Sequence, residues 1–281
     1  MLARRLLGKT GVELSIIGFG GIVVSGVTPA EAADIVSEAI TRGVNYFDVA
    51  PTYGNAEERL GPALAPYRGQ VFLACKTTKR DAAGARAELE NSLRMLRTDH
   101  FDLYQLHAMT TEKDMAEALG PGGALEAFVA AKDKGQVRYL GFSAHSADLA
   151  VRLLRAFPFD TVMLPINFVS WLQADFGPQV VAEARAKGVG VLALKGLARQ
   201  RLQAGQSRPY AKCWYEPCTD PTEAELALRF TLSQDITAAL PPGEAELFRR
   251  ALDIAERFQP LTPAEVAELR RRAAALQPVF A

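Results

Sequence analysis

The sequence predicts an α/β fold, a (β/α)8 TIM barrel that forms one domain over residues 1–281. Short apolar runs alternate with longer amphipathic stretches along most of the chain, a pattern typical of parallel strands joined by helices. The length of 281 residues suits an α/β barrel, which stays one domain at this size. Because eight such units occur and their strands are mostly apolar, a closed barrel is favoured over an open sheet.

Both ends of the chain are expected to carry additional elements. Gly8 and Gly11 flank a Lys-Thr pair, so residues 4–17 are expected to form an N-terminal β-hairpin. Thr262 is followed directly by a proline, and a glutamate stands three positions after it, which is the pattern of a capping box. We therefore expect a C-terminal helical tail at residues 262–276.

The barrel elements follow from the same alternation. The expected strands are residues 16–19, 45–49, 71–76, 101–106, 139–142, 161–165, 190–194 and 236–240. The expected helices are residues 28–43, 56–65, 81–96, 124–134, 147–156, 180–187, 222–232 and 245–258. Residues 196–220 are much longer than the usual connection of a compact domain, so we expect a long loop there, a candidate lid over the barrel mouth.

Charge and composition exclude several classes of partner. Basic and acidic residues balance at 32 each, so no basic field is present to hold a nucleic acid or an anionic membrane. No apolar run reaches the ~20 residues of a membrane span, and the N-terminus lacks the apolar segment of a signal peptide. The three cysteines are too few for a disulfide framework. We expect a cytoplasmic protein with no bound metal; the sequence does not indicate its oligomeric state.

Four polar residues are expected at one end of the barrel. Asp48, Lys76 and His107 each end a mostly apolar run, and these runs are the second, third and fourth predicted strands. Tyr53 follows Asp48 by five residues, near enough for its loop to turn back over the carboxylate. Because the active sites of such barrels lie at the carboxyl ends of the strands, we expect the four side chains to converge.

These residue types together predict a tuned general acid. A tyrosine has a pKa near ~10, and a neighbouring lysine ammonium is expected to lower it. Asp48 would hold Lys76 charged and in place, while His107 would bind the substrate oxygen or relay a proton to Tyr53. Each residue also has a structural alternative: a turn cap for Asp48, a solvated strand end for Lys76, a core position for His107 and loop packing for Tyr53.

Several motifs resemble the signatures of the aldo-keto reductase family. Residues 47–54, Phe-Asp-Val-Ala-Pro-Thr-Tyr-Gly, and residues 102–107, Asp-Leu-Tyr-Gln-Leu-His, carry most of this resemblance. Residues 17–21, residues 141–143 and Asn167 also fall where the family pattern expects them. The resemblance covers most of the chain, and the combination of motifs is far more specific than any one of them.

The resemblance implies a cofactor and a set of site residues. The cofactor would be a nicotinamide dinucleotide, NADP(H) in preference to NAD(H), lying across the barrel mouth without a Rossmann fingerprint, and the sequence contains none. The implied catalytic residues are Asp48, Tyr53, Lys76 and His107. The implied cofactor-binding residues are Gly21, Ile22, Asp48, Ser143, Asn167, Lys195, Gly196 and Leu197. The residues expected at the substrate are Ile22, Tyr53, His107, Met109 and Trp171.

Roles within the cofactor set also follow from the resemblance. Ser143 and Asn167 would hold the nicotinamide carboxamide, and Gly21 and Ile22 would line the nicotinamide pocket. Residues 195–197 would approach the pyrophosphate.

The chain departs from the family pattern at the cofactor. Met163 stands where a glutamine is common, and Leu194 stands where a tyrosine often stacks on the nicotinamide. Residues 241–246 are short and acidic where the adenosine-phosphate site usually has basic and hydroxyl residues, and Arg249 and Arg250 are the nearest cations. Residues 194–197, Leu-Lys-Gly-Leu, resemble the Met-Lys-Pro-Leu of a bacterial subgroup. We therefore expect a bacterial-type member that is divergent at the adenosine site.

The expected function is NAD(P)H-dependent reduction of an aldehyde or ketone, or oxidation of the corresponding alcohol or sugar, with Tyr53 as the general acid or base. Two alternatives stay open. One is a cofactor-binding regulatory subunit with little turnover. The other is a cofactor-assisted sugar lyase or epimerase, which would consume no net NAD(P)H. The sequence identifies neither the physiological substrate nor the direction of the reaction.

Overall fold

Eight parallel strands form a barrel in a computed structural model that describes residues 1–203 and 205–281. The strands are β3 (Phe19–Gly20), β4 (Tyr46–Asp48), β5 (Phe72–Thr77), β6 (Phe101–Met109), β7 (Val137–Ala144), β8 (Thr161–Pro165), β9 (Gly190–Leu194) and β12 (Ala238–Leu240). Neighbours in the sheet follow the chain order from β3 to β12. A parallel bridge joins Ile17 to Ala239, so the first and last strands meet and the predicted barrel is confirmed.

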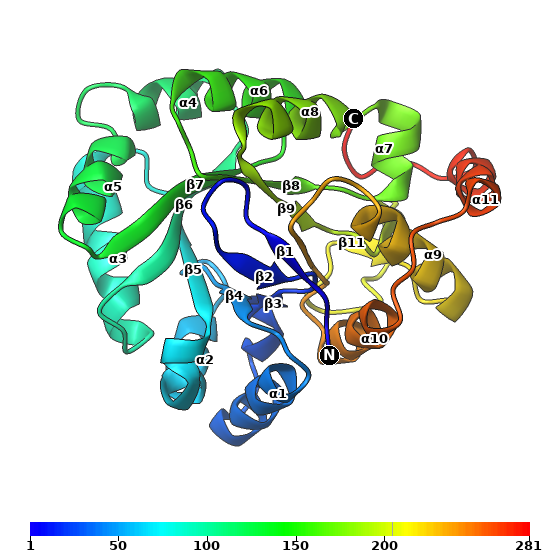
Figure 1. Cartoon of the computed structure of the whole chain (residues 1–281), viewed down its shortest axis with the longest axis horizontal. Coiled ribbons are helices and arrows are strands. Elements are labelled where there is room, and N and C mark those ends of the chain that lie inside the picture. The colour runs from blue at the N-terminus through cyan, green and yellow to red at the C-terminus, as the bar shows by residue number, and fades with distance from the viewer. Residues whose placement is uncertain (204) are drawn as a thin grey trace.

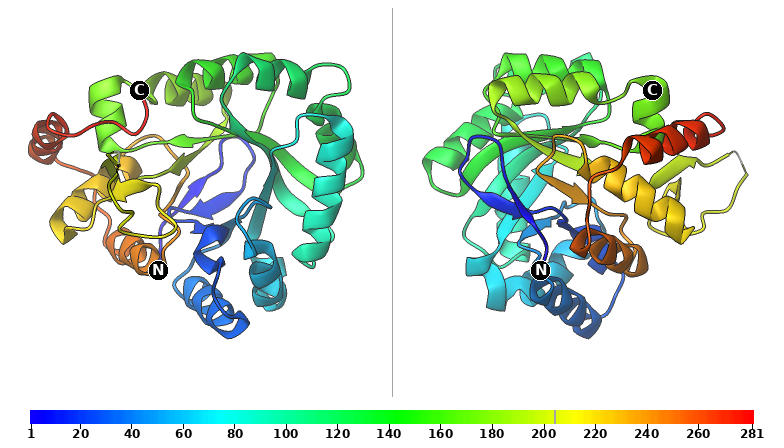
Figure 2. Two further views of the ribbon diagram at one scale, coloured as in Figure 1. Left: turned by 180° about the vertical axis from the view of Figure 1, so that it is seen from behind. Right: turned by 45° about the vertical axis from the view of Figure 1, so that its right-hand side comes forward.

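Helices form a ring outside the strands (Figures 1 and 2). They are α1 (Pro29–Thr41), α2 (Ala56–Leu64), α3 (Ala82–Met95), α4 (Glu112–Leu119), α5 (Ala124–Asp133), α6 (Ala147–Ala156), α7 (Phe168–Ala174), α8 (Pro178–Lys187), α9 (Pro221–Leu232), α10 (Ala245–Glu256) and α11 (Pro263–Ala273). Two 3-10 segments, η1 (Gly21–Val24) and η2 (Ala65–Gln70), follow β3 and α2. Neither α4 nor α7 was expected from the sequence. No helix in this described part of the chain is long and apolar enough to cross a membrane.

Side-chain caps explain where several helices begin. Thr28 and Thr262 make the predicted capping boxes, in which the threonine and a glutamate three residues later satisfy each other's backbone N–H groups. Thr111 makes the same motif with Asp114 at the start of α4. Asp114 stands at the third position of this capping box, where the common pattern has Glu or Gln. The start of α4 is therefore harder to recognise from the sequence.

The N-terminal hairpin closes one end of the barrel. Strands β1 (Arg4–Leu6) and β2 (Glu13–Ser15) pair antiparallel, as predicted. They cross the centre of the barrel in the view of Figure 1. Leu7 and Leu14 are fully buried against interior residues of the barrel strands. Since the hairpin covers the amino ends of the strands, the opposite, carboxyl ends remain for a site.

The barrel interior changes from apolar to polar along each strand. One cluster of buried, mostly apolar side chains lies inside the barrel next to the hairpin, toward the amino ends of the strands. It includes Tyr46, Phe72, Leu103, Met163 and Leu192. Side chains alternate between the two faces of a strand, so the residue two or four positions further along points to the same interior. Applied to β4, β5 and β6, this rule brings three polar residues to the carboxyl end, namely Asp48, Lys76 and His107.

The segment 196–220, expected to be a long loop, contains two short strands. β10 (Ala198–Arg201) and β11 (Tyr215–Pro217) pair antiparallel. Residue 204 lies outside the described residues. The last residues of the chain run beside β10, where the Arg201 N–H donates to the carbonyl oxygen of Gln277 (3.1 Å). The role of this segment as a lid stays a prediction.

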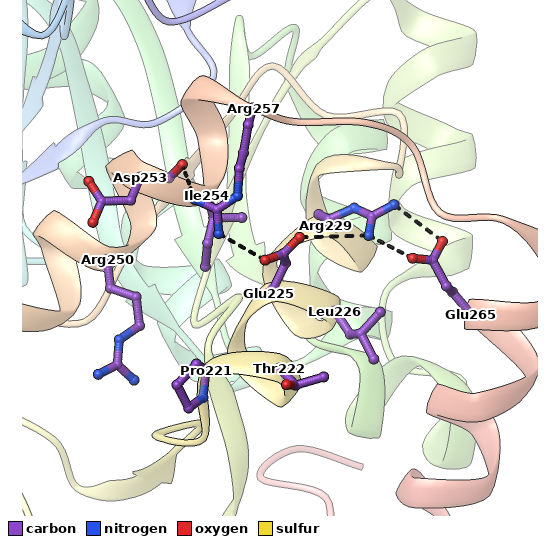
Figure 3. Close-up of a pocket in the computed structure, with 10 residues that line it drawn as sticks. All are labelled: Pro221, Thr222, Glu225, Leu226, Arg229, Arg250, Asp253, Ile254, Arg257 and Glu265. Carbon is purple, nitrogen blue, oxygen red and sulfur yellow. Dashed lines mark hydrogen bonds and ion pairs between the residues drawn. The ribbon is translucent and has the colours of Figure 1, made fainter.

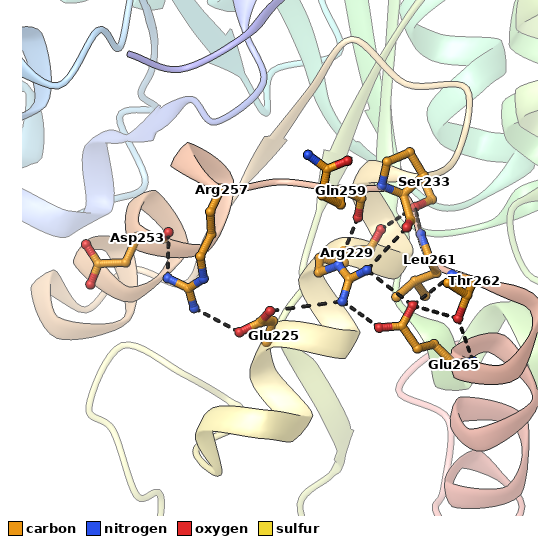
Figure 4. A network of polar contacts seen from close by, with 10 residues as sticks. Glu225, Arg229, Ser233, Asp253, Arg257, Gln259, Leu261, Thr262 and Glu265 are labelled. Atoms are coloured by element: carbon orange, nitrogen blue, oxygen red, sulfur yellow. Dashed lines mark hydrogen bonds and ion pairs between the residues drawn. The ribbon is translucent and has the colours of Figure 1, made fainter.

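Arg229 on α9 is the centre of a polar network that joins three helices (Figure 4). Its guanidinium donates to the carbonyl oxygens of Gln259 (2.8 Å) and Pro260 (3.2 Å), and to the carboxylate of Glu265 on α11 (2.7 Å). Glu225, one turn earlier on α9, accepts from Arg257 at the end of α10 (2.8 Å). The network lines a groove of about 420 Å³ in the outer layer of the molecule (Figure 3). Its ion pairs bind the helices to one another.

Replacing Arg229 with methionine should lower stability by about 1–3 kcal/mol, because two carbonyl groups and the Glu265 carboxylate lose their donor. The side chain is only 13% exposed, so water replaces these bonds incompletely. The midpoint of urea unfolding measures the effect. Arg272→Met is the matched control, since Arg272 only pairs with Glu268 one turn earlier on α11, and such pairs contribute about 0.5 kcal/mol. Equal losses in the two variants would contradict a role for the network in stability.

Candidate active site

A buried ion pair lies at the carboxyl ends of β4 and β5. The Lys76 ammonium donates to Asp48 Oδ1, and both residues are only 1% exposed. The other carboxylate oxygen accepts from the Tyr46 hydroxyl (3.1 Å) and from Gln105 Nε2 (3.0 Å). Asp48 is therefore held by three donors from three adjacent strands, which fixes the position of the ammonium it pairs with.

Opposing effects act on the buried Lys76. Burial lowers the pKa of the ammonium, while the charge of Asp48, the phenol of Tyr53 and the hydrogen bond to Asp48 raise it. The net pKa of Lys76 lies above its ordinary value. The site thus contains a permanent positive charge at neutral pH.

Tyr53 lies between Lys76 and His107. The turn after β4, in which the Tyr53 N–H donates to the carbonyl oxygen of Ala50 (3.0 Å), returns the ring over the ion pair. The Lys76 ammonium is 5.5 Å from the centroid of the Tyr53 ring, and the His107 ring centroid is 5.9 Å away on an edge-to-face contact. The structure thus brings the side chains of Asp48, Tyr53, Lys76 and His107 together, as expected from the strand ends.

The expected lowering of the Tyr53 pKa is not what the structure shows. Burial raises the pKa of the phenol, and this effect exceeds the lowering by the Lys76 charge. The contribution of Lys76 has the predicted sign, but it is partly cancelled by the neighbouring Asp48 carboxylate. Tyr53 is accordingly a neutral phenol at neutral pH, the form that can donate a proton.

A bulge sets the direction of His107. The register between β6 and β7 shifts between Leu106 and Met109, and Ala108 has a left-handed φ of 54°. Two groups hold this strained backbone: the Ala108 N–H donates to Ser143 Oγ (2.8 Å), and Arg80 Nη2 donates to the His107 carbonyl oxygen (2.8 Å). Bulges next to active sites turn a side chain away from its regular direction.

His107 is held in its neutral form. Burial is the main cause, and the nearby charge of Lys76 adds to it, so that the pKa of His107 falls to about 3. Its Nδ1 atom is buried and has no hydrogen-bond partner among the described residues. A neutral imidazole keeps one N–H donor for an incoming oxygen.

Ser143 and Asn167 lie at the ends of the neighbouring strands β7 and β8. Asn167 caps α7, its Oδ1 accepting from the Ser170 N–H (2.9 Å), while its Nδ2 is fully buried and has no partner among the described residues. An unpartnered buried amide donor is costly unless a ligand accepts its hydrogen bond. This arrangement fits a nicotinamide carboxamide, whose oxygen is an acceptor.

The remaining cofactor candidates are close to the barrel mouth. Gly21 packs so tightly that a Cβ there would lie 2.7 Å from Val49 Cγ2, and a Cβ on Gly196 would lie 3.0 Å from Thr231 Oγ1. Ile22 is partly exposed and contacts the segment after β12. The Leu197 side chain is fully buried in the core, so only its backbone could reach a cofactor. Lys195 adopts a left-handed φ of 60° directly after β9.

Two residues expected at the substrate, Met109 and Trp171, take part in core packing. Met109 is fully buried in the core between strands and helices, because the bulge at Ala108 changes the face on which the following residue lies. Trp171 packs against Phe230 of α9 (6.2 Å between ring centroids) and against Gly177. Core packing accounts for both side chains, and their role at the substrate stays a prediction.

Tyr46 and Gln105 are site residues that the sequence analysis did not identify. Each stands two positions before a recognised residue, Tyr46 before Asp48 and Gln105 before His107. The period of two in a strand could have found them, because residues i and i+2 face the same side. Among the described residues, no group of three or more histidine, cysteine, aspartate or glutamate side chains could hold a metal ion.

The cations after β12 are already engaged. Arg249 pairs with Glu38 (2.9 Å), and Arg250 donates to the Thr219 carbonyl and to Glu246. Glu244 accepts from the Lys212 N–H (2.8 Å). Among the described residues after β12, Arg249 and Arg250 therefore already have hydrogen-bond partners that a 2′-phosphate of NADP(H) would have to replace.

Acid should destabilise the protein between about pH 6.5 and pH 3–4. His107 and His145 have folded-state pKa values of about 3 and about 4, both lowered mainly by burial, against 6.5 when unperturbed. The unfolded chain therefore binds protons in this window that the folded chain excludes, so stability falls as the pH falls. The double variant His107→Asn/His145→Asn should lose less Tm between pH 7 and pH 4.5 than the wild type. His100→Asn is the control, and a double variant with wild-type acid sensitivity would contradict the assignment.

Comparison with known proteins supports the chemistry that this geometry suggests. The model of the Aldo/keto reductase family matches residues 16–269. An uncharacterized oxidoreductase of Bacillus subtilis, YqkF, is 26% identical over 277 residues, covering 88% of each chain. The L-galactose dehydrogenase of Arabidopsis thaliana is 27% identical over 213 residues, covering 69% of this chain and 65% of the plant protein.

A solved structure shows the same fold. The aldo-keto reductase AKR11C1 from Bacillus halodurans, in its holo form, superposes with a TM-score of 0.77 over 99% of both chains at 24% identity. The match to the family model spans the barrel from before β3 into α11 and includes all four residues around the buried ion pair. The chain therefore belongs to the aldo/keto reductase family and is an NAD(P)-dependent oxidoreductase.

Proposed function

We propose that Tyr53 is the general acid that protonates the oxygen of an aldehyde or ketone as the substrate is reduced, and the base when the alcohol is oxidised. The observation that carries this proposal is the position of the Tyr53 ring, between the Lys76 ammonium at 5.5 Å and the His107 ring at 5.9 Å. The nicotinamide, when bound, supplies or accepts the hydride. The hydroxyl of Tyr53 supplies the proton, so hydride and proton together convert the carbonyl to an alcohol.

Lys76 and Asp48 act on the phenol rather than on the substrate. As the proton leaves, the Tyr53 oxygen becomes negative in a buried site, which would be unfavourable without a nearby cation. The Lys76 ammonium offsets that developing charge, and it stays protonated because Asp48 raises its pKa. Asp48 is in turn oriented by Tyr46 and Gln105.

His107 acts as a neutral hydrogen-bond donor. With a pKa of about 3, its imidazole carries no charge at neutral pH, so it orients the carbonyl oxygen without competing as an acid. The bulge held by Ser143 and Arg80 determines where its ring lies. The proton for the substrate therefore comes from Tyr53.

Tyr53→Phe should lower kcat by several orders of magnitude while cofactor affinity changes little, since only the hydroxyl is removed. Steady-state reduction of an aromatic aldehyde, with NAD(P)H absorbance as the readout, measures the rate. Tyr67→Phe is the matched control, because the Tyr67 hydroxyl only contacts Ser37 in the helical layer. A Tyr53→Phe enzyme that keeps a rate within about tenfold of the wild type would remove Tyr53 from the role of acid.

We propose that Ser143 and Asn167 hold the nicotinamide carboxamide and that Gly21, Ile22 and residues 195–197 contact the rest of the cofactor. NADP(H) is the proposed cofactor, although the engaged arginines after β12 limit its advantage over NAD(H). The support is the unpartnered Nδ2 of Asn167, which a carboxamide oxygen would satisfy.

Asn167→Asp should weaken cofactor binding by about 10- to 100-fold, because it replaces the Nδ2 donor with an acceptor. The aspartate keeps the cap on α7, so the fold should be retained. Titration with NADPH and then NADH, following the fluorescence of Trp171 and Trp214, gives both affinities. We expect NADPH to bind the wild type no more than about tenfold tighter than NADH, a difference of about 1.4 kcal/mol.

Asn91→Asp, which adds the same negative charge on the exposed face of α3, is the control for the titration. Unchanged affinity in Asn167→Asp would remove Asn167 from the cofactor site. A wild type that binds neither dinucleotide would contradict the proposed site as a whole.

A further inference from the structure

The ammonium of Lys195 is a cation at the barrel mouth that the proposed proton transfer does not use. It follows β9 directly, and its side chain is partly exposed. Its Nζ atom lies 5.5 Å from the centroid of the Trp214 ring, 5.3 Å from the centroid of the Phe280 ring and 3.4 Å from His145 Nε2. Three aromatic side chains therefore surround the ammonium.

The direction of this side chain follows from the strand order. His145 comes directly after β7, and β8 lies between β7 and β9 in the sheet. The ammonium has therefore crossed the end of β8 to reach His145. The His145 N–H donates to the Met109 carbonyl oxygen at the end of β6 (3.2 Å), so the residue that the ammonium contacts is joined to the strand that carries His107. Its charge is one of the causes that lower the pKa of His107.

No carboxylate neutralises this ammonium. Among residues 1–203 and 205–281, Lys195 forms no ion pair, and its one polar contact is with a histidine. Asp48, the acid at the centre of the site, is already paired with Lys76. Of the charged groups Asp48, Lys76 and Lys195, the Lys195 ammonium is thus the one without an oppositely charged partner among the described residues.

The surroundings of Lys195 are suited to a ligand rather than to simple packing. Trp214 is 45% exposed, an unusual state for the largest apolar side chain. Phe280 stacks on His145, with 5.2 Å between centroids and 18° between planes. Together these rings form apolar walls around the ammonium. A carboxylate on an apolar skeleton would find there both a cation to pair with and surfaces to pack against.

We infer that Lys195, His145, Trp214 and Phe280 form a subsite for a carboxylate carried by the carbonyl substrate. The inference rests on the proposed function, because it names the class of substrate that Tyr53 would protonate. The substrate class is an aldehyde or ketone with a carboxylate on an aromatic or short aliphatic skeleton. One ammonium balances one negative charge, so a carboxylate fits this subsite better than a phosphate dianion.

The same lysine could instead serve the cofactor pyrophosphate. The carbonyl oxygens of Lys195 and Leu197 already accept from the Ala198 and Cys218 N–H groups (2.9 and 2.8 Å), which leaves backbone N–H groups at the end of β9 for a pyrophosphate. The ammonium lies two strands away, beside His145 after β7. This separation favours the substrate as the partner of the ammonium. The two roles predict different results when the Lys195 charge is removed. A substrate subsite predicts a loss of activity toward the acidic substrate alone, whereas a pyrophosphate contact predicts equal losses for the acidic and the neutral substrate.

The test compares 4-formylbenzoate with its methyl ester as substrates of the full-length protein at saturating cofactor. The wild type should have a higher kcat/KM for the acid than for the ester. Lys195→Met should lower the ratio of the two values by about 10- to 100-fold, the effect of removing a charged hydrogen-bond partner. Lys134→Met is the matched control, because it removes the same charge from an exposed position at the end of α5 and should leave the ratio unchanged.

Two results would overturn the subsite. The ratio could stay unchanged in Lys195→Met, because neither substrate is affected or because both lose the same factor, or the wild type could prefer the ester. Equal losses would assign Lys195 to the cofactor or to folding. Absence of reduction of either aldehyde by the wild type would contradict the proposed function instead.

A binding measurement tests the subsite independently of turnover. Benzoate and benzamide have nearly the same shape, and only benzoate carries the charge. Quenching of Trp214 fluorescence should show that the wild type binds benzoate at least about tenfold tighter, and that Lys195→Met loses this preference. Equal binding of benzoate and benzamide by the wild type would remove the subsite, whatever the catalytic result.

Discussion

The rest of the active site depends on the buried ion pair between Lys76 and Asp48. Removing one partner of such a pair typically costs about 3–5 kcal/mol, because the other charge is left in the interior without compensation. The barrel supplies that compensation with Tyr46 and Gln105, which hold the second oxygen of the carboxylate. Since the ammonium cannot move, the ring of Tyr53 above it lies in a constant field.

Burial determines the charge states of the other two residues. It raises the pKa of Tyr53 against the effect of Lys76, and it lowers the pKa of His107 in the same direction as Lys76. Both side chains are therefore neutral at neutral pH. One is an acid that keeps its proton until a carbonyl oxygen accepts it, and the other is a donor that orients that oxygen. Burial thus shifts the pKa values of these two neighbours in opposite directions, whereas the charge of Lys76 lowers both.

The two ends of the barrel differ in how their interior is filled. The hairpin fills the amino ends with Leu7 and Leu14, which makes that end part of the core. Among the described residues, His107 Nδ1, Asn167 Nδ2 and Gln105 Oε1 are buried polar atoms without a partner near the carboxyl ends of the strands. Such atoms reduce stability unless a ligand satisfies them, as a cofactor would satisfy Asn167 Nδ2. The chain supports this arrangement with the strained backbone at Ala108 and Lys195.

The sequence by itself determined the barrel and the four residues around the ion pair. Apolar runs of strand length, helix caps at Thr28 and Thr262, and polar residues at strand ends are local features, so they can be read without tertiary contacts. The helices α4 and α7 were not predicted, because each spans only about two turns and so has little apolar periodicity to read. Only the tertiary structure decided the neutral state of Tyr53 and His107, since burial is a property of the whole barrel. Two further features also required the tertiary structure: the bulge that moves Met109 into the core, and the position of Phe280 beside Lys195. Both depend on contacts between segments far apart in the chain.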